Sequence, residues 1–74
     1  MNNINIVTEY IKLEQFLKLS AITGSGGEAK TFILENEIFV NGDLEKRRGR
    51  KLRHGDTIEI YDEIYTIVQV GESE

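Results

Sequence analysis

The spacing of the apolar residues changes near residue 37, and this change most limits the folds open to the chain. Leu13, Phe16 and Leu17 stand at i, i+3 and i+4, and a second run has the same spacing, so both runs predict amphipathic helices. Beyond Glu37, apolar and polar residues alternate in short runs, which is typical of strands with one buried face. The predicted elements are a strand over 3–8, helices over 13–19 and 28–36, and strands over 38–40, 57–61 and 64–70.

Turn signals separate the predicted strands. Asn41-Gly42 is a strong signal for a two-residue hairpin, and a return strand can begin at Leu44. His54-Gly55-Asp56 predicts another turn before the next strand. These patterns predict an α+β fold, in which two N-terminal helices pack on a small, mostly antiparallel, curved sheet.

The small size of the chain limits what it can do chemically. A chain of 74 residues is predicted to form a single domain over residues 1–74. Because a domain of this size buries only about 60% of its unfolded surface, it has little room for a deep catalytic cavity. The absence of cysteine excludes disulfides and thiolate metal sites, and one histidine excludes a His-rich metal site. We therefore expect no enzymatic activity, no cofactor and no small-molecule substrate.

The sequence shows no signal for a membrane or for secretion. No run approaches the roughly 18 apolar residues of a membrane-spanning helix, so no membrane partner is expected. Residues 1–5 contain neither a basic residue nor a long apolar stretch, so they do not resemble a secretory signal. The expected compartment is the cytoplasm.

Positive charge is concentrated in one segment of an otherwise acidic chain. The formal net charge is -4, yet six of the nine Lys and Arg residues fall within residues 46–54, where no acid is present. These six residues, called the basic segment below, are Lys46, Arg47, Arg48, Arg50, Lys51 and Arg53. Two interpretations remain open, a surface for a polyanion or a solvated loop. The position of the segment between predicted strands and its wealth of arginine, which suits phosphate, favour a polyanion surface.

A glycine-rich segment precedes the second predicted helix. Gly24-Ser25-Gly26-Gly27-Glu28-Ala29 matches the G-x-G-x-x-A pattern of dinucleotide-binding proteins. That pattern requires a preceding strand, whereas a helix is predicted here, so we expect no nucleotide cofactor. Ser25 is expected to cap the second helix, with Glu28 completing a capping box. Two uses of the glycines remain open, namely a simple turn, or contact with a phosphate at the helix N-terminus, where Lys30 adds a positive charge.

The histidine and the aromatic residues give weaker signals. His54 has no nucleophile near it in the sequence, so we interpret it as a polar surface group and not as a catalytic base. The rings of Tyr10, Tyr61 and Tyr65 can stack on bases, but strand alternation favours burial of most of the aromatic residues at sheet edges. For Phe39, stacking and burial both remain open.

Several motifs occur in the order and at the distances found in one RNA-binding family. They are Lys12-Leu13-Glu14, Ala29, Ile38-Phe39-Val40-Asn41-Gly42 and Gly55-Asp56-Thr57-Ile58. On these motifs, residues 12–61 resemble the S4-like RNA-binding domain, which is shared by a small-subunit ribosomal protein, bacterial tyrosyl-tRNA synthetases, pseudouridine synthases and a ribosome-associated heat-shock protein. The whole chain is most similar to the stand-alone small bacterial subfamily often called YaaA, in which Ser-Gly-Gly-Glu-Ala-Lys and Arg-Arg-Gly-Arg-Lys recur.

The resemblance implies an αL motif, in which two helices and the following hairpin present one surface to RNA. Lys12 stands at the leading Arg position of the family, Ser25 at the serine of the second helix, and the basic segment at the basic connection before Gly-Asp. Gly26 stands where the wider family usually has Arg, and Glu14 where it has Asp. The expected RNA-binding residues are Lys12, Ser25, Lys30, Lys46, Arg47, Arg48, Arg50, Lys51 and Arg53.

The expected function is therefore non-catalytic binding of structured RNA, either ribosomal RNA or tRNA, by phosphate contacts. A compact basic surface without an aromatic platform recognises the shape of an RNA backbone better than its bases. The expected context is ribosome assembly or translation, with a ribosomal subunit as partner. The alternative that remains open is a protein adaptor, whose basic segment docks on an acidic partner protein.

Overall fold

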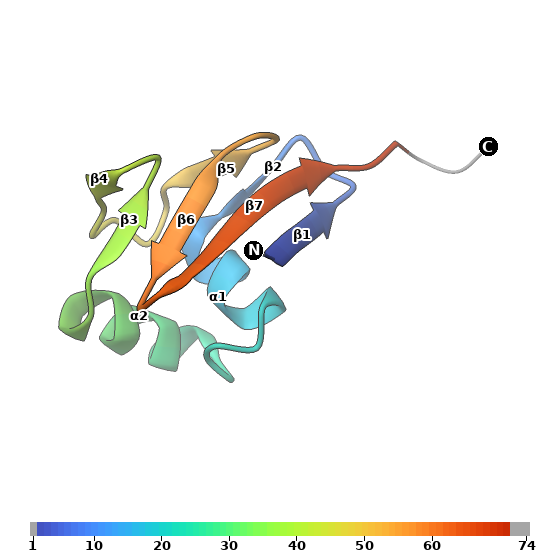
Figure 1. Ribbon diagram of the computed structural model, residues 1–74. Coiled ribbons are helices and arrows are strands. Elements are labelled where there is room, and N and C mark those ends of the chain that lie inside the picture. Colours follow the sequence, from blue (N-terminus) through green and yellow to red (C-terminus); the bar gives the residue numbers. More distant parts are fainter. Residues whose placement is uncertain (1, 72–74) are drawn as a thin grey trace.

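The computed structural model describes residues 2–71, in which two helices follow two strands and precede five more (Figure 1). The strands are β1 (Asn2–Ile6), β2 (Tyr10–Lys12), β3 (Ile38–Val40), β4 (Asp43–Leu44), β5 (Lys51–Arg53), β6 (Thr57–Ile60) and β7 (Glu63–Gln69). The helices are α1 (Leu13–Leu19) and α2 (Gly26–Glu35). Neither helix has the length and the apolar character that crossing a membrane requires.

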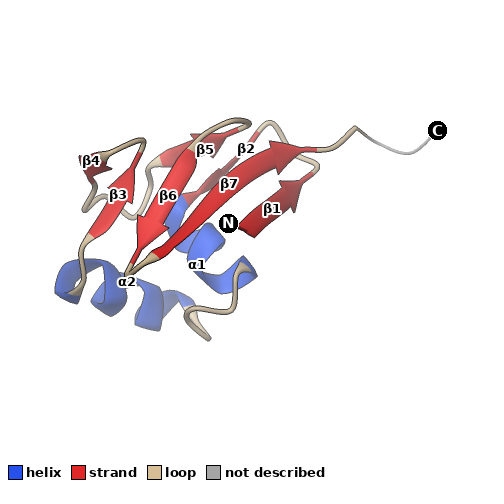
Figure 2. Cartoon of the chain, in the orientation of Figure 1, coloured by secondary structure: helices blue, strands red, loops and turns tan. Residues whose placement is uncertain are grey.

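The strands of the described residues form two separate sheets (Figure 2). The larger sheet is mixed and has the order β1-β7-β6-β3-β4. β1 runs parallel to β7, with Ile4 opposite Ile67, whereas the other neighbouring strands in this sheet are antiparallel. β2 and β5 pair antiparallel and form a two-stranded sheet, called the β2–β5 ribbon below. Both sheets therefore pair strands that are distant in the sequence, β1 with β7 and β2 with β5.

The observed fold belongs to the predicted α+β class, but the predicted arrangement of its elements is wrong. The two helices are not N-terminal, because β1 and β2 precede them; β1 matches the strand predicted over 3–8, whereas β2 is not predicted. The larger sheet contains one parallel pairing, between β1 and β7, among otherwise antiparallel ones, and a separate ribbon accompanies it, whereas a single sheet is predicted. The physical reason is distance along the chain. β1 pairs with β7 and β2 with β5, so neither pairing leaves a signal in the local sequence.

Local patterns predict the helices and most turns correctly. α1 has the predicted bounds, and its residues Leu13, Phe16 and Leu17 are fully buried. α2 begins two residues before its predicted start and buries Ala29 and Ile33. Both helices pack against one continuous core, to which the strands contribute Ile6, Ile38, Val40, Leu52, Ile58, Ile60 and Ile67. Since burial of one such aliphatic side chain contributes about 1.5–3 kcal/mol, this core is the main source of stability.

The two predicted turns are hydrogen-bonded to each other. Asn41 and Gly42 have φ of 53° and 88°, as a tight hairpin between β3 and β4 requires. The Asn41 side chain donates to Asp56 Oδ1 at 3.1 Å and accepts from the Thr57 backbone N–H at 3.0 Å. Gly55, in the second turn, also has a positive φ of 90°. The motifs over residues 40–42 and 55–57 therefore stabilise each other, which explains their polar and glycine residues without a ligand.

Candidate nucleic-acid interface

The basic segment is held between the ends of the two helices. Lys46 Nζ donates to the carbonyls of Ile33 at 3.0 Å and Asn36 at 2.9 Å, so its charge lies at the C-terminus of α2. A cation is favourable there, because the last carbonyls of a helix lack partners and carry partial negative charge. At the other end, the carbonyls of Arg48 and Arg50 accept from the first backbone N–H groups of α1, at 3.1 and 2.8 Å. The segment is therefore an ordered connection and not a free loop.

A buried carboxylate organises the two central arginines of the basic segment. Glu45 is only 6% exposed, and its Oε2 accepts from Arg47 Nε at 2.9 Å. Its Oε1 accepts from Arg50 at 2.8 Å, which joins both guanidinium groups to one carboxylate. The side-chain hydrogen bond from Arg47 is the main cause that lowers the pKa of Glu45 to about 2. The same bond raises the pKa of Arg47. Two positive charges thus share one negative charge, and a net positive charge remains.

The depressed pKa of Glu45 predicts a loss of stability in acid. Because the folded-state pKa of about 2 lies below the ordinary 4.5, ionised Glu45 stabilises the fold above about pH 4.5. This contribution to stability is lost as the pH falls from about 4.5 toward about 2. Urea unfolding across the range should show a falling midpoint in the wild-type protein, and Glu45→Gln should flatten the fall. The exposed Glu59→Gln variant serves as the control. An equally steep fall in Glu45→Gln would contradict the role of Glu45.

The β2–β5 ribbon carries three cations on one face, namely Lys12 and two members of the basic segment, Lys51 and Arg53. Tyr10 lies opposite Arg53, and Lys12 lies opposite Lys51, so these four side chains share a face. The residues between them, Ile11 and Leu52, point to the other face, and Leu52 is fully buried in the core. Lys12, which lies far from the basic segment in sequence, therefore lies directly beside it in the structure.

Tyr10 also lies on the basic face of the β2–β5 ribbon, although the sequence analysis does not include it among the RNA-binding residues. Its ring lies 4.9 Å from Lys51 Nζ and 5.2 Å from Arg53 Cζ, within the range of cation–π contacts. The signal that could have found it is the polar–apolar–polar pattern shared by residues 10–12 and 51–53. Such matched triplets can form two short paired strands. Of the three tyrosines, Tyr10 and Tyr65 are partly buried, whereas Tyr61 is 69% exposed.

The predicted contacts at the N-terminus of α2 are engaged within the protein. Ser25 Oγ accepts from the Glu28 backbone N–H at 3.3 Å, as the predicted cap requires. Glu28 Oε1 accepts in turn from the Gly24 N–H at 2.6 Å, one residue before the position that a capping box uses. The Glu28 carboxylate thus occupies the N-terminal end of α2, where the sequence leaves open either a simple turn or a phosphate contact. Lys30 is exposed, and the helical spacing places it on the flank of α2 away from Glu28.

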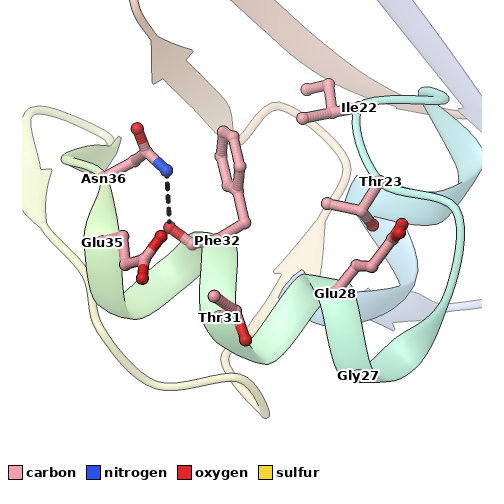
Figure 3. A pocket seen from close by; sticks show the side chains of 8 residues that line it. All are labelled: Ile22, Thr23, Gly27, Glu28, Thr31, Phe32, Glu35 and Asn36. Atoms are coloured by element: carbon pink, nitrogen blue, oxygen red, sulfur yellow. Dashed lines mark hydrogen bonds between the residues drawn. The ribbon is translucent and has the colours of Figure 1, made fainter.

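Two surface hollows differ in charge. One, of about 500 Å³, is lined by Arg47, Gly49, Arg50 and Lys51 and suits an anion. The other, of about 590 Å³, follows α2 and is lined by Ile22, Thr23, Gly27, Glu28, Thr31, Phe32, Glu35 and Asn36 (Figure 3). Its charged groups are two carboxylates, so it does not suit RNA. Within residues 2–71, no group of His, Asp or Glu side chains is arranged to hold a metal ion.

Comparisons with known proteins give two matches to this chain. A family model described as S4 domain matches residues 4–68. The chain is 54% identical over 59 residues to a probable ribosome maturation protein, RlbA, of Bacillus subtilis strain 168. That similarity spans 80% of this chain and 83% of the relative. The residues that the family model matches include the basic segment and most of both sheets.

Proposed function

The chain belongs to the S4 domain family, and from this premise we propose that it is a non-catalytic protein that grips structured RNA by phosphate contacts. The proposed ligand is ribosomal RNA or tRNA, and the proposed setting is the bacterial cytoplasm. The name of the Bacillus relative, which describes ribosome maturation, supports ribosomal RNA within an assembling subunit as the first candidate.

One observation carries this proposal, namely the continuous basic surface formed by the basic segment and the β2–β5 ribbon. The ribbon brings Lys12 opposite Lys51, and both helices hold the basic segment in place through its side chain at Lys46 and its backbone carbonyls. An ordered set of cations loses less conformational entropy on binding than a flexible loop does. Such a surface suits the regular phosphate backbone of folded RNA.

Salt dependence of RNA binding tests the proposal. If about four or five phosphates are contacted, the logarithm of the affinity should fall with the logarithm of salt concentration at a slope of about -3 to -4. Fluorescence anisotropy with a labelled ribosomal RNA fragment would measure this slope. Affinity that does not change with salt would contradict phosphate contacts.

A pull-down with and without nuclease separates RNA binding from the protein adaptor that the sequence also allows. Recovery of ribosomal particles that nuclease abolishes supports the proposed function. Recovery of a protein that nuclease leaves unchanged, together with no binding to the RNA fragment, would favour the adaptor instead.

A further inference from the structure

The outward face of the β2–β5 ribbon places like charges directly opposite each other. Lys12 and Lys51 are paired in the antiparallel register, and both are exposed. Directly opposed like charges in a strand pair destabilise it, because the two side chains lie on the same face within a few ångström. The free protein therefore carries an unfavourable arrangement at this position. A polyanion bound between the two lysines would convert it into a favourable one.

Tyr10 arranges the remaining two cations of this face. Lys51 and Arg53 are two residues apart on β5, and a strand separates such residues by about 6.6 Å. Both cationic groups lie over the same ring, at 4.9 and 5.2 Å from its centroid. Arg53 also contacts Glu9 at 3.3 Å, but Glu9 is 81% exposed, so solvent weakens this pair. The ring is the contact that Lys51 and Arg53 have in common.

We propose that the β2–β5 ribbon is a clamp for successive phosphates of one RNA strand, in which Tyr10 is the positioning residue. The Cα atoms of Lys51 and Arg53, about 6.6 Å apart along the strand, have a spacing close to that of neighbouring phosphates along one RNA strand, and Lys12 faces the first of these phosphates from β2. Tyr10 acts through the two cations that cover its ring and not by stacking on a base. This inference rests on the proposed function and assigns a particular subsite to it.

The pair Tyr10→Leu and Tyr10→Phe tests the positioning role. Phenylalanine keeps the ring and its cation–π contacts, so its affinity for the labelled ribosomal RNA fragment should remain within about twofold of wild type. Leucine keeps apolar bulk without the ring, and affinity should fall about fivefold, since Lys51 and Arg53 then lose the contact that positions them and must be ordered when RNA binds. Equal affinities of both variants and the wild type would overturn the clamp.

A double-mutant cycle separates positioning from direct contact with RNA. In a background of Lys51→Gln and Arg53→Gln, Tyr10→Leu should cause no further loss of affinity, because the cations through which Tyr10 acts are gone. If the fivefold loss persists in that background, Tyr10 contacts RNA directly and the positioning role is wrong.

Lys12→Gln should show opposite effects on stability and on binding. Removing one of the two opposed lysines should raise the melting temperature by about 1–5 °C. It should lower affinity about fivefold to tenfold at about 0.1 M salt, because one phosphate contact is lost. The control Lys18→Gln removes one positive charge from α1 and should change neither the melting temperature nor the affinity. Loss of affinity without a gain in stability would overturn the opposed-charge argument.

Failure of the clamp is distinguishable from failure of the proposed function. If the wild-type protein shows no salt-dependent RNA binding, the proposed function is wrong and the clamp is wrong with it. If the wild type binds with the expected slope but the Tyr10 and Lys12 variants behave like the wild type, only the clamp is overturned.

Discussion

A variant that lacks four cations of the ribbon and the adjacent turn should bind a ribosomal RNA fragment about a thousandfold more weakly at about 0.1 M salt. The four changes are Lys12→Ala, Arg48→Ala, Lys51→Ala and Arg53→Ala. Each lost phosphate contact reduces the salt slope by about 0.7–0.9, which corresponds to about fivefold to eightfold in affinity at that salt concentration. Anisotropy titrations at several salt concentrations would measure both quantities.

The same variant should keep its fold. All four side chains are exposed, and the change removes the opposed pair of Lys12 and Lys51. Its melting temperature should therefore stay within a few degrees of wild type. Lys46→Ala is the matched contrast, because this lysine binds the carbonyls at the end of α2. It should lower stability more than affinity. Wild-type affinity in the quadruple variant would show that the ribbon is not the interface.

Replacing both Arg47 and Arg50 by Ala should strongly destabilise the protein. Glu45 is buried, and the two guanidinium groups are its side-chain partners among the described residues. A buried charge left without its partners costs about 3–5 kcal/mol. For a domain of this size, such a loss lowers the melting temperature by at least about 12 °C and removes a large part of the total stability. Thermal and urea unfolding would measure it.

A third substitution provides the control for this destabilisation. Adding Glu45→Met removes the buried charge, and replacing a buried ion pair by an apolar side chain is often nearly neutral. The triple variant should therefore regain most of the lost stability. If it remains as unstable as the double variant, the arginines stabilise the fold through something other than Glu45. The result also bears on binding experiments, because weak RNA binding by the double variant would partly report unfolding.

The extent to which the sequence predicts the fold follows the distance between contacting residues. α1 and β3 have the predicted bounds because their signals are local, in the spacing of Phe16 and Leu17 and in the alternation around Phe39. The hairpin at Asn41-Gly42 is predicted because the turn needs positive φ at both positions. β2 and β5 are missed because the strand that each pairs with is distant in the sequence, so no local turn signal links the two.

The candidate site divides in the same way. The charge pattern alone identifies the basic segment, since six cations in nine residues form a positive surface in most conformations. The pattern cannot show that Lys46 caps α2 or that Glu45 joins Arg47 and Arg50. It also cannot show that Lys12 and Tyr10 lie beside Lys51 and Arg53.

The sequence by itself therefore determined the α+β class, both helices, the main turns and the place of the positive charge. These features depend on interactions within a few residues, which the order of side chains specifies directly. The tertiary structure decided the mixed sheet, the β2–β5 ribbon and the division of the cations between intramolecular partners and free surface. These features depend on residues such as Tyr10 and Arg53, which are distant in sequence and are brought together in the folded structure, where Leu52 of β5 lies in the core.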